Sequence, residues 1–487
     1  MRPDYAGLLS ALRPEASLVL GALAVLGLDL TAFRARSLVE RQRLALFVGA
    51  LAVAAAGAEA LLGARGPVFG GVLILDPLAV AARIGVLALT LLTLGVAWGA
   101  APFRQPGEYV AVMLFAATGL VLMAAAQQLL VVFLALELAS LSLYVLAGFD
   151  RSRPESAEAA LKYFLFGGMA AAFLLFGFSL IYGVTGSIEL PRIAAQIAVQ
   201  GASPLLLVAL VMVLVAFGFK SAAAPFHLWA PDVYQGAPAP SAALVASASK
   251  LAGFTLFTRL LWPGFGAAAG NPAAHLGGSG WLPTVALVAG ASLLLGNIGA
   301  LAQASLRRLL AYSAIGHAGA MLLGVMAAGR SGPAALFYYA STYGLATVGA
   351  FGVITAAERA GRCELITDLA GLHRRSPLLA ACLTVFILSL AGIPPLAGFF
   401  GKLTVFAAAI GLGGIGGPAG GLALLAIALS AVALYYYLKV LKQALVAAPA
   451  AEAARIAVPR VTAAALLAAA GLIIWFGINP GELLGLF

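Results

Sequence analysis

The sequence predicts an all-α integral membrane protein with about fourteen membrane-spanning helices. Hydrophobic residues make up 63% of the 487-residue chain and charged residues only 9%, whereas charged residues form about 25% of an ordinary soluble domain. The mean hydropathy is +1.05. Apolar stretches of about 20 residues, the length that crosses a bilayer as a helix, recur along the whole chain. These observations indicate a single polytopic membrane domain over residues 1–487.

Each predicted span is an apolar run that charged or turn residues bound on both sides. Three N-terminal helices (1–107) precede two groups of five, a first repeat over 108–262 and a second over 281–446, and one C-terminal helix lies within 447–487. The predicted spans are 15–33, 42–63, 74–99, 108–125, 127–148, 157–185, 202–228, 238–262, 281–303, 309–328, 332–357, 377–410, 418–446 and 461–479.

The seventh and twelfth spans are interrupted near their middle. The seventh reads VAFGFKSAAAPFHLW and contains Pro225, and the twelfth reads LSLAGIPPLAGFFGKL and contains Pro394 and Pro395. Proline removes a backbone donor and clashes with the preceding turn, so both helices should break and leave backbone groups that only protein or water can satisfy. Two breaks five spans apart, each beside a lysine, predict two inverted five-helix repeats with broken helices 7 and 12.

The distribution of basic residues predicts the orientation in the membrane. Of the 28 Lys and Arg, five fall within spans, 17 fall on the loops after odd-numbered spans and six fall on the opposite face. Basic loops stay in the cytoplasm. Both termini are therefore expected on the periplasmic side.

Four ionisable residues lie within apolar spans, far from any other charge: Glu137, Lys220, Lys250 and Lys402. At the centre of a lipid-facing helix each charge would cost about 2.5–3.5 kcal/mol, so these side chains must face protein or water. Burial disfavours an ammonium ion and a nearby carboxylate favours it. A movement of Glu137 toward or away from Lys220 would therefore switch that lysine between holding and releasing a proton. The alternative is that the four charges only hold helices together.

Three further residues are candidate proton relays. His317 lies inside the tenth span and His227 follows the first break, and an imidazole titrates near neutral pH. Lys162 lies near the start of the sixth span. Two alternatives stay open, because either histidine can be a hydrogen-bonded structural residue and Lys162 can extend its ammonium group to the membrane surface.

The sequence gives no sign of a cofactor or a metal in this chain. Cys363 and Cys382 lack CxxC spacing and clustered histidines, so neither an iron–sulfur cluster nor a zinc site is expected. The stretch GLGGIG (411–416) matches a dinucleotide-binding pattern in its letters alone, because no predicted strand precedes it and Pro418 follows. The excess of basic residues lies in short loops and indicates topology, not nucleic-acid binding.

Four stretches together resemble the antiporter-like membrane subunits of respiratory complex I, the bacterial NADH-quinone oxidoreductase. APDVYQGAP after the first break and GFFGKL after the second are most similar to the subunit N branch of that family. Subunits L and M usually read closer to LPDAH at the first place, and subunit M has a glutamate in place of Lys402. The four stretches are EAALKYFLFG (158–167), FKSAAAPFHLWAPDVYQGAPAPSAALVASASKLAGF (219–254), SLRRLLAYSAIGHAGAMLLG (305–324) and FILSLAGIPPLAGFFGKLTVF (386–406).

The resemblance implies roles for the buried charges. Glu137 and Lys220 would be a paired switch, Lys250 the central proton carrier and Lys402 the terminal carrier. It further implies a bacterial inner-membrane subunit of a translocase that couples electron transfer from NADH to quinone, performed in other subunits, to proton transport. NADH, FMN, iron–sulfur clusters and quinone are then expected in partner subunits, and the partners are other membrane and peripheral subunits of complex I and membrane lipid.

Lys162 and His317 would be relays by the same resemblance. Mrp-type sodium/proton antiporter subunits share the broken helices and the lysines, so a subunit of such a cation/proton antiporter is the alternative function. A scaffold whose charges only lock helices together is the third.

Overall fold

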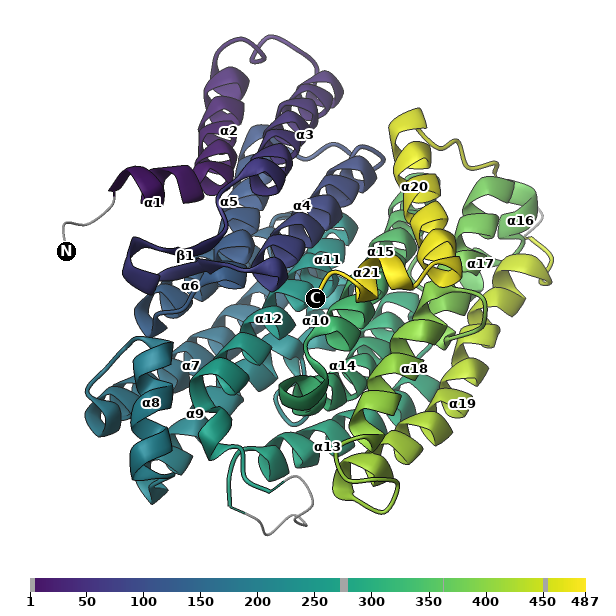
Figure 1. Cartoon of the computed structure of the whole chain (residues 1–487). Coiled ribbons are helices and arrows are strands. Elements are labelled where there is room, and N and C mark those ends of the chain that lie inside the picture. The colour runs from purple at the N-terminus through teal and green to yellow at the C-terminus, as the bar shows by residue number, and fades with distance from the viewer. Residues whose placement is uncertain (1–4, 272–278, 362, 450–453) are drawn as a thin grey trace.

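The computed structural model describes residues 5–271, 279–361, 363–449 and 454–487. Figure 1 shows long helices packed side by side. A short antiparallel hairpin joins α3 to α4. The N-terminal elements are α1 (Tyr5–Ala11), α2 (Arg13–Leu30), α3 (Leu38–Leu62), β1 (Gly66–Val68), β2 (Leu73–Leu75) and α4 (Pro77–Ala97).

Two groups of helices follow, and a C-terminal pair closes the chain. The first group comprises α5 (Pro106–Ala125), α6 (Leu129–Ala147), α7 (Pro154–Thr185), α8 (Leu190–Gln200), α9 (Pro204–Ser221), α10 (Trp229–Gly236), α11 (Ala239–Ala246) and α12 (Ala248–Arg259). The second group comprises α13 (Leu282–Leu301), α14 (Leu306–Ser331), α15 (Ala334–Glu358), α16 (Leu372–Arg375), α17 (Pro377–Ala391), α18 (Ala397–Ile410) and α19 (Pro418–Leu445). The C-terminal pair is α20 (Arg460–Ile478) and α21 (Gly481–Leu484).

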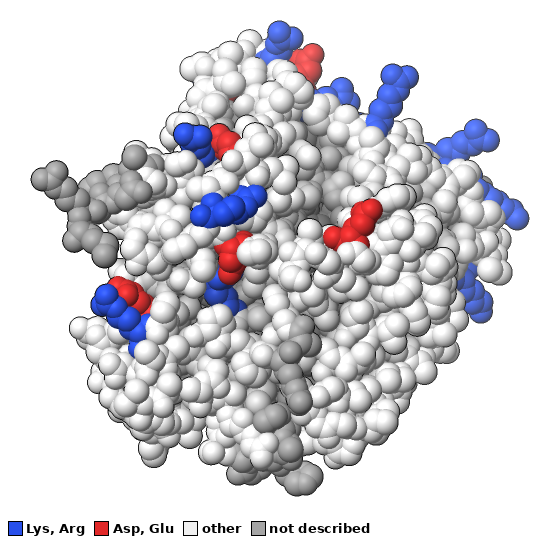
Figure 2. All heavy atoms as spheres, viewed as in Figure 1, with Lys and Arg blue, Asp and Glu red and all other residues white. Residues whose placement is uncertain are grey.

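The described helices confirm an all-α membrane architecture. Twelve of them are long and apolar enough to cross a membrane. The other two expected spans correspond to α2, which carries Arg13, Glu15 and Asp29, and to α17 with α18, each of which is short by itself. The total of fourteen spans therefore stays a prediction. Figure 2 shows the same character on the molecular surface, where most of the face in view carries no charged side chain.

Both predicted breaks are present, and they have the same local shape. α9 ends at Ala222 (φ 56°) and α17 ends at Gly392 (φ 86°), so a left-handed residue stops each helix. A cis X–Pro bond follows in both places, Ala224–Pro225 and Pro394–Pro395. In each group the fourth span is the broken one. The predicted five spans per group, an odd number, would start the second group on the opposite side of the membrane from the first, as the predicted inverted repeat requires.

A third interruption was not predicted. The span expected as one helix over 238–262 is divided at Ser247 (φ −116°, ψ −85°) into α11 and α12. No proline or glycine marks this position in the sequence. The interruption lies three residues before Lys250, so it affects the turn that positions this lysine.

The most buried helices lie where the two groups meet. α12 packs on α4, α5, α14 and α15, and α15 packs on α4, α11, α17, α18 and α20. Every residue from 239 to 261 is buried, whereas only 33% of the apolar stretch of each of α7, α19 and α20 is buried. In a bilayer the exposed apolar faces contact lipid, and the buried centre is the place where ionisable groups are tolerated.

Candidate functional site

The first pair of candidate residues, Glu137 and Lys220, lies on α6 and α9; Glu137 is half-buried and Lys220 is buried. α6 carries Glu137 and Ser140, one helical turn apart, and Lys220 lies in the last turn of α9. The Lys220 ammonium donates a hydrogen bond to Ser140 Oγ at 3.4 Å. Glu137 Oε1 is buried and has no hydrogen-bond partner among the described residues. No nitrogen–oxygen pair of Glu137 and Lys220 lies within 4.0 Å. The two side chains are neighbours, but they are not paired in this structure.

The break after Lys220 is sealed by side chains from other elements. The Trp229 indole N–H donates to the Phe219 carbonyl at 3.0 Å, and the Ala224 amide donates to Ser292 Oγ of α13 at 2.8 Å. Backbone groups released by a broken helix need such partners at membrane depth. Lys220 is only 4% exposed. The second bond also ties the first break to the second group of helices.

Gly253 connects the surroundings of Lys220 with those of Lys250. Both Gly253 and Lys250 belong to α12, about one turn apart. A Cβ atom at Gly253 would lie 3.3 Å from Lys220 Cγ. The stem of Lys220 therefore runs along the face of α12 next to Lys250.

Lys250 reaches from the first group of helices into the second. It is 2% exposed, and its ammonium donates to the Ala314 carbonyl of α14 at 2.5 Å. The same nitrogen lies 5.4 Å from the centre of the Tyr343 ring of α15, within the range of a cation–π interaction. Among the described residues Lys250 thus pairs with no carboxylate, and its ammonium group contacts a carbonyl and an aromatic face.

His317 extends the row of ionisable residues that Glu137, Lys220 and Lys250 begin and that Lys402 ends. It lies on α14, three residues after Ala314. Its Nδ1 lies 2.7 Å from the Tyr339 hydroxyl, and its Nε2 lies 3.1 Å from the Tyr437 hydroxyl. The ring centres of His317 and Tyr343 are 4.9 Å apart, so one tyrosine ring contacts both the lysine and the histidine. Either hydroxyl can give or take a proton from an imidazole, depending on its tautomer.

Lys402 and His317 line the same small cavity. The cavity has a volume of about 20 Å³, enough for one water molecule. Its polar lining is His317, Lys402, Tyr339, Tyr436, Asn297, Ser313 and Ser430. The Lys402 ammonium donates to the Ala391 carbonyl at 2.8 Å, a backbone group released by the second break. One water would therefore place His317 and Lys402 in a shared hydrogen-bond network.

Lys162 and His227 lie outside this row. Lys162 forms ion pairs of 2.6 Å with both Glu158 and Asp232, and its side chain is 37% exposed. Asp232 also accepts a hydrogen bond from Arg308 at 2.7 Å. His227 follows the first break and lines a surface groove of about 350 Å³ with Lys162 and Asp232. The structure therefore groups Lys162 and His227 with each other and not with Lys220 or Lys250.

The sequence reasoning missed the uncharged members of the row. Ser140 and the buried tyrosines Tyr339, Tyr343 and Tyr437 contact the lysines and the histidine directly. The available signal was the clustering of tyrosines in YYASTY (338–343) and YYY (435–437) within apolar spans, because a buried tyrosine hydroxyl usually finds a polar partner.

Comparison with known proteins identifies the family. Residues 126–417 match the family described as NADH:quinone oxidoreductase/Mrp antiporter, TM. The chain is 47% identical to NADH-quinone oxidoreductase subunit N 2 of Acidobacterium capsulatum, over 99% of this chain and 98% of that protein. The chain belongs to the NADH:quinone oxidoreductase/Mrp antiporter family.

Solved structures of the family share the same fold. A chain of respiratory complex I from Thermus thermophilus is 34% identical, with a TM-score of 0.78 and coverage of 97% of this chain and 98% of that chain. A chain of the Mrp complex from Dietzia sp. DQ12-45-1b is 24% identical, with a TM-score of 0.79 and coverage of 97% and 96%. The second likeness is one of fold alone. All the residues of the row lie within the part of the chain that matches the family or within about 20 residues of its end.

Proposed function

We propose that the chain is subunit N of a bacterial NADH-quinone oxidoreductase and that it moves protons through the buried row. The high identity to a subunit N over the full length supports the assignment. One observation carries the proton-transfer role: Glu137, Lys220, Lys250, His317 and Lys402 follow one another across both groups of helices, with Ser140, Gly253, the Tyr343 ring and a small cavity between successive members. Such groups inside a membrane mark ion or proton pathways.

Glu137 and Lys220 act as the switch of this proposal. In the observed arrangement Ser140 holds the ammonium of Lys220, and Glu137 Oε1 has no hydrogen-bond partner. Approach of the two side chains to about 4 Å would favour the ammonium form by about 4 kcal/mol at an effective dielectric constant of about 20. Separation removes that stabilisation and lets the lysine give its proton to the next carrier. Small movements of α6 against α9 therefore suffice to drive one transfer.

Lys250, His317 and Lys402 carry the proton onward. Lys250 and His317 both contact the Tyr343 ring. Lys250 also donates to the Ala314 carbonyl of α14, which lies about one helical turn before His317. The His317–Tyr437 bond and the small cavity then lead to Lys402. None of these groups needs a cofactor. NADH, FMN, iron–sulfur clusters and quinone belong to partner subunits in this proposal, and the described residues include no group of three His, Cys, Asp or Glu that could hold a metal.

Replacement of Lys402 tests the terminal step. Lys402→Ala removes the last carrier, so NADH-driven proton pumping by the assembled complex should fall at least about tenfold, measured as fluorescence quenching of a pH-sensitive dye in membrane vesicles. Lys439→Ala is the matched control, because Lys439 is exposed at the end of α19 and contacts only a loop carbonyl at 3.5 Å. Equal pumping in both variants, with intact assembly, would support a scaffold role instead.

The proposed location is the bacterial inner membrane, with both termini in the periplasm and with the other complex I subunits as partners. The 17 basic residues on one set of loops support this orientation. A reporter enzyme that is active only in the periplasm should be active when fused to Phe487 and inactive when inserted after Arg151. The opposite pattern would reverse the orientation.

Sequence identity favours subunit N over an Mrp-type antiporter subunit. The chain is 47% identical to a subunit N and 24% identical to the Mrp chain, which shares the fold. Sodium-dependent proton exchange in a strain that lacks the redox subunits would favour the antiporter.

A further inference from the structure

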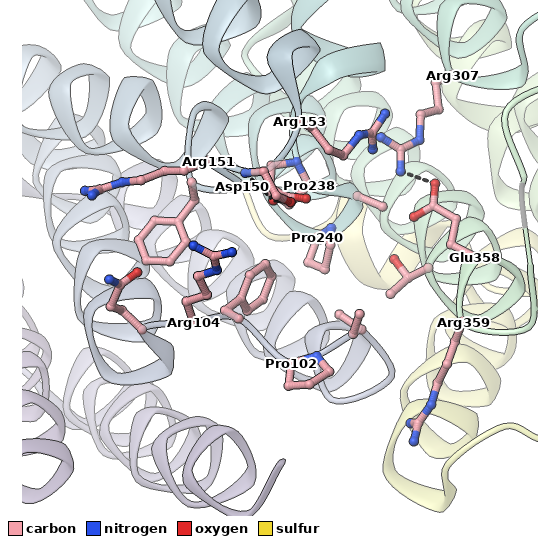
Figure 3. Close-up of a pocket in the computed structure, with 18 residues that line it drawn as sticks. Pro102, Arg104, Asp150, Arg151, Arg153, Pro238, Pro240, Arg307, Glu358 and Arg359 are labelled. Carbon is pink, nitrogen blue, oxygen red and sulfur yellow. Dashed lines mark hydrogen bonds and ion pairs between the residues drawn. The ribbon is translucent and has the colours of Figure 1, made fainter. Parts of the chain in front are cut away.

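A second hollow lies at the surface, and none of the row residues lines it. It has a volume of about 380 Å³ and lies between the α4–α5 loop, the α6–α7 loop, the start of α11 and the ends of α14 and α15 (Figure 3). These segments come from both groups of helices and from the N-terminal helices. All of them belong to the loop set that is rich in basic residues. We call this hollow the arginine pocket.

The charges of the arginine pocket are unbalanced. Asp150 is bound by Ser152 at 2.6 Å, and Glu358 is bound by Arg307. Arg153 reaches two glutamates only at 3.8 Å each. Among the described residues, no carboxylate pairs with the other three arginines. The charged lining consists of Arg104, Arg151, Arg153, Arg307 and Arg359 against Asp150 and Glu358.

Arg307 is the buried floor of the arginine pocket. Its side chain is 3% exposed, and it donates to the Gln235 and Ala237 carbonyls at 3.0 and 2.9 Å. Its Nε is buried without a hydrogen-bond partner among the described residues. Figure 3 shows the Arg153 guanidinium directed toward Arg307 and the Arg104 guanidinium directed into the pocket. Two like charges side by side, with one buried donor unused, favour an anion between them.

The depth of the arginine pocket points to the class of anion. The arginine pocket lies at the ends of membrane-spanning helices, where the helices meet water. Three helices end beside it, α4, α6 and α15, and four begin beside it, α5, α7, α11 and α14. Phosphate headgroups of lipids lie at the same level, and basic pockets between membrane helices on the cytoplasmic side recognise them. We propose that the arginine pocket binds a phosphate group, presented by the headgroup of an anionic phospholipid.

Phosphate binding in the arginine pocket would affect the broken span of the first group. Through Arg307 the arginine pocket is joined to the carbonyls that link α10 to α11, the connection between the broken span and the span of Lys250. A phosphate that competes with Glu358 for Arg307 therefore acts on the segment between them.

Lipid retention by the full-length chain tests this site. The chain is purified from vesicles of phosphatidylglycerol and phosphatidylcholine, and the bound lipid is measured by native mass spectrometry. Arg104→Gln with Arg153→Gln should lower the retention of phosphatidylglycerol, because each arginine near a headgroup changes affinity about fivefold. Retention of phosphatidylcholine should not change. Arg307 is left in place, since its removal would strand Glu358 and two carbonyls.

Arg34→Gln with Arg36→Gln is the matched control, because both residues are exposed on the same basic loop set and neither lines the arginine pocket. This control should retain phosphatidylglycerol as the unaltered chain does. A second measurement compares the unfolding temperature in inorganic phosphate with that in chloride at equal ionic strength. If phosphate alone raises the unfolding temperature, and the pocket variant loses this increase, the pocket recognises phosphate and its ligand is free phosphate. Equal lipid retention and an equal response to phosphate in the two double variants would overturn the proposal. Release of an acidic partner subunit by the pocket variant, with lipid retention unchanged, would also overturn it.

Discussion

The two broken helices have the same backbone shape, but they present their lysines differently. Lys220 precedes its break, is sealed from the surface and has a carboxylate, Glu137, close by. Lys402 follows its break, borders a cavity and donates to the Ala391 carbonyl, and no ion pair of Lys402 occurs among the described residues. In the proposed mechanism the first break is therefore switched by moving one charge, whereas the Lys402 ammonium group is held by a backbone carbonyl that no substitution removes.

Removal of the carboxylate should have the largest effect, and only on the first break. Glu137→Gln keeps the shape of the side chain and deletes the charge that distinguishes the two sites. NADH-driven proton pumping should fall at least about tenfold, while the assembled complex keeps its electron transfer from NADH to an artificial acceptor. Normal pumping in this variant would show that the two breaks work in the same way, without a charge switch.

Substitution of the positive-φ residue at each break compares how the two breaks contribute to stability. Gly392→Ala places a Cβ 2.9 Å from Lys402 Cδ at φ 86°, so the free energy of unfolding should fall by more than about 1 kcal/mol and the ammonium of Lys402 should be displaced. Ala222 already adopts φ 56° with a Cβ. Ala222→Gly should therefore change stability by less than about 1 kcal/mol. Thermal unfolding of the two purified variants measures both effects, and an equal loss in the two would contradict the assigned contact.

The smallest effect is expected at Ser140. Ser140→Ala removes the hydroxyl that holds Lys220 at 3.4 Å, and a neutral acceptor of this length contributes about 1 kcal/mol or less. Lys220 should then pair more readily with Glu137, and pumping should slow by about twofold to fivefold. A rate of proton pumping equal to that of the unaltered complex would mean that Ser140 does not set the resting position of Lys220.

Residue types that are rare in their surroundings gave the clearest predictions. Prolines predicted both breaks, which the structure confirms, and single charges in apolar spans predicted Glu137, Lys220, Lys250 and Lys402 as proton carriers, which stays a prediction. The hydroxyl groups that join these charges were not predicted, because serine and tyrosine are common enough in membrane helices to attract no notice.

Two features needed the three-dimensional packing. The interruption at Ser247 has no proline or glycine, so only the contacts of α11 and α12 with their neighbours reveal it. For Lys162 the sequence left open a relay and a side chain extended to the membrane surface, and it could not show that Asp232, 70 residues away, pairs with this lysine. Contacts between residues so far apart in the chain are set by the fold and leave no local pattern.

In the proposed pathway, protons pass through Lys250 from the first group of helices to the second. The most direct measurement is the number of protons pumped per NADH oxidised by the assembled complex, compared between Lys250→Ala and Lys439→Ala. Lys250→Ala deletes the ammonium group that contacts the Ala314 carbonyl of α14 and the Tyr343 ring of α15, so we expect a lower ratio for this variant and an unchanged ratio for Lys439→Ala. An unchanged ratio in Lys250→Ala, with the complex fully assembled, would contradict the account.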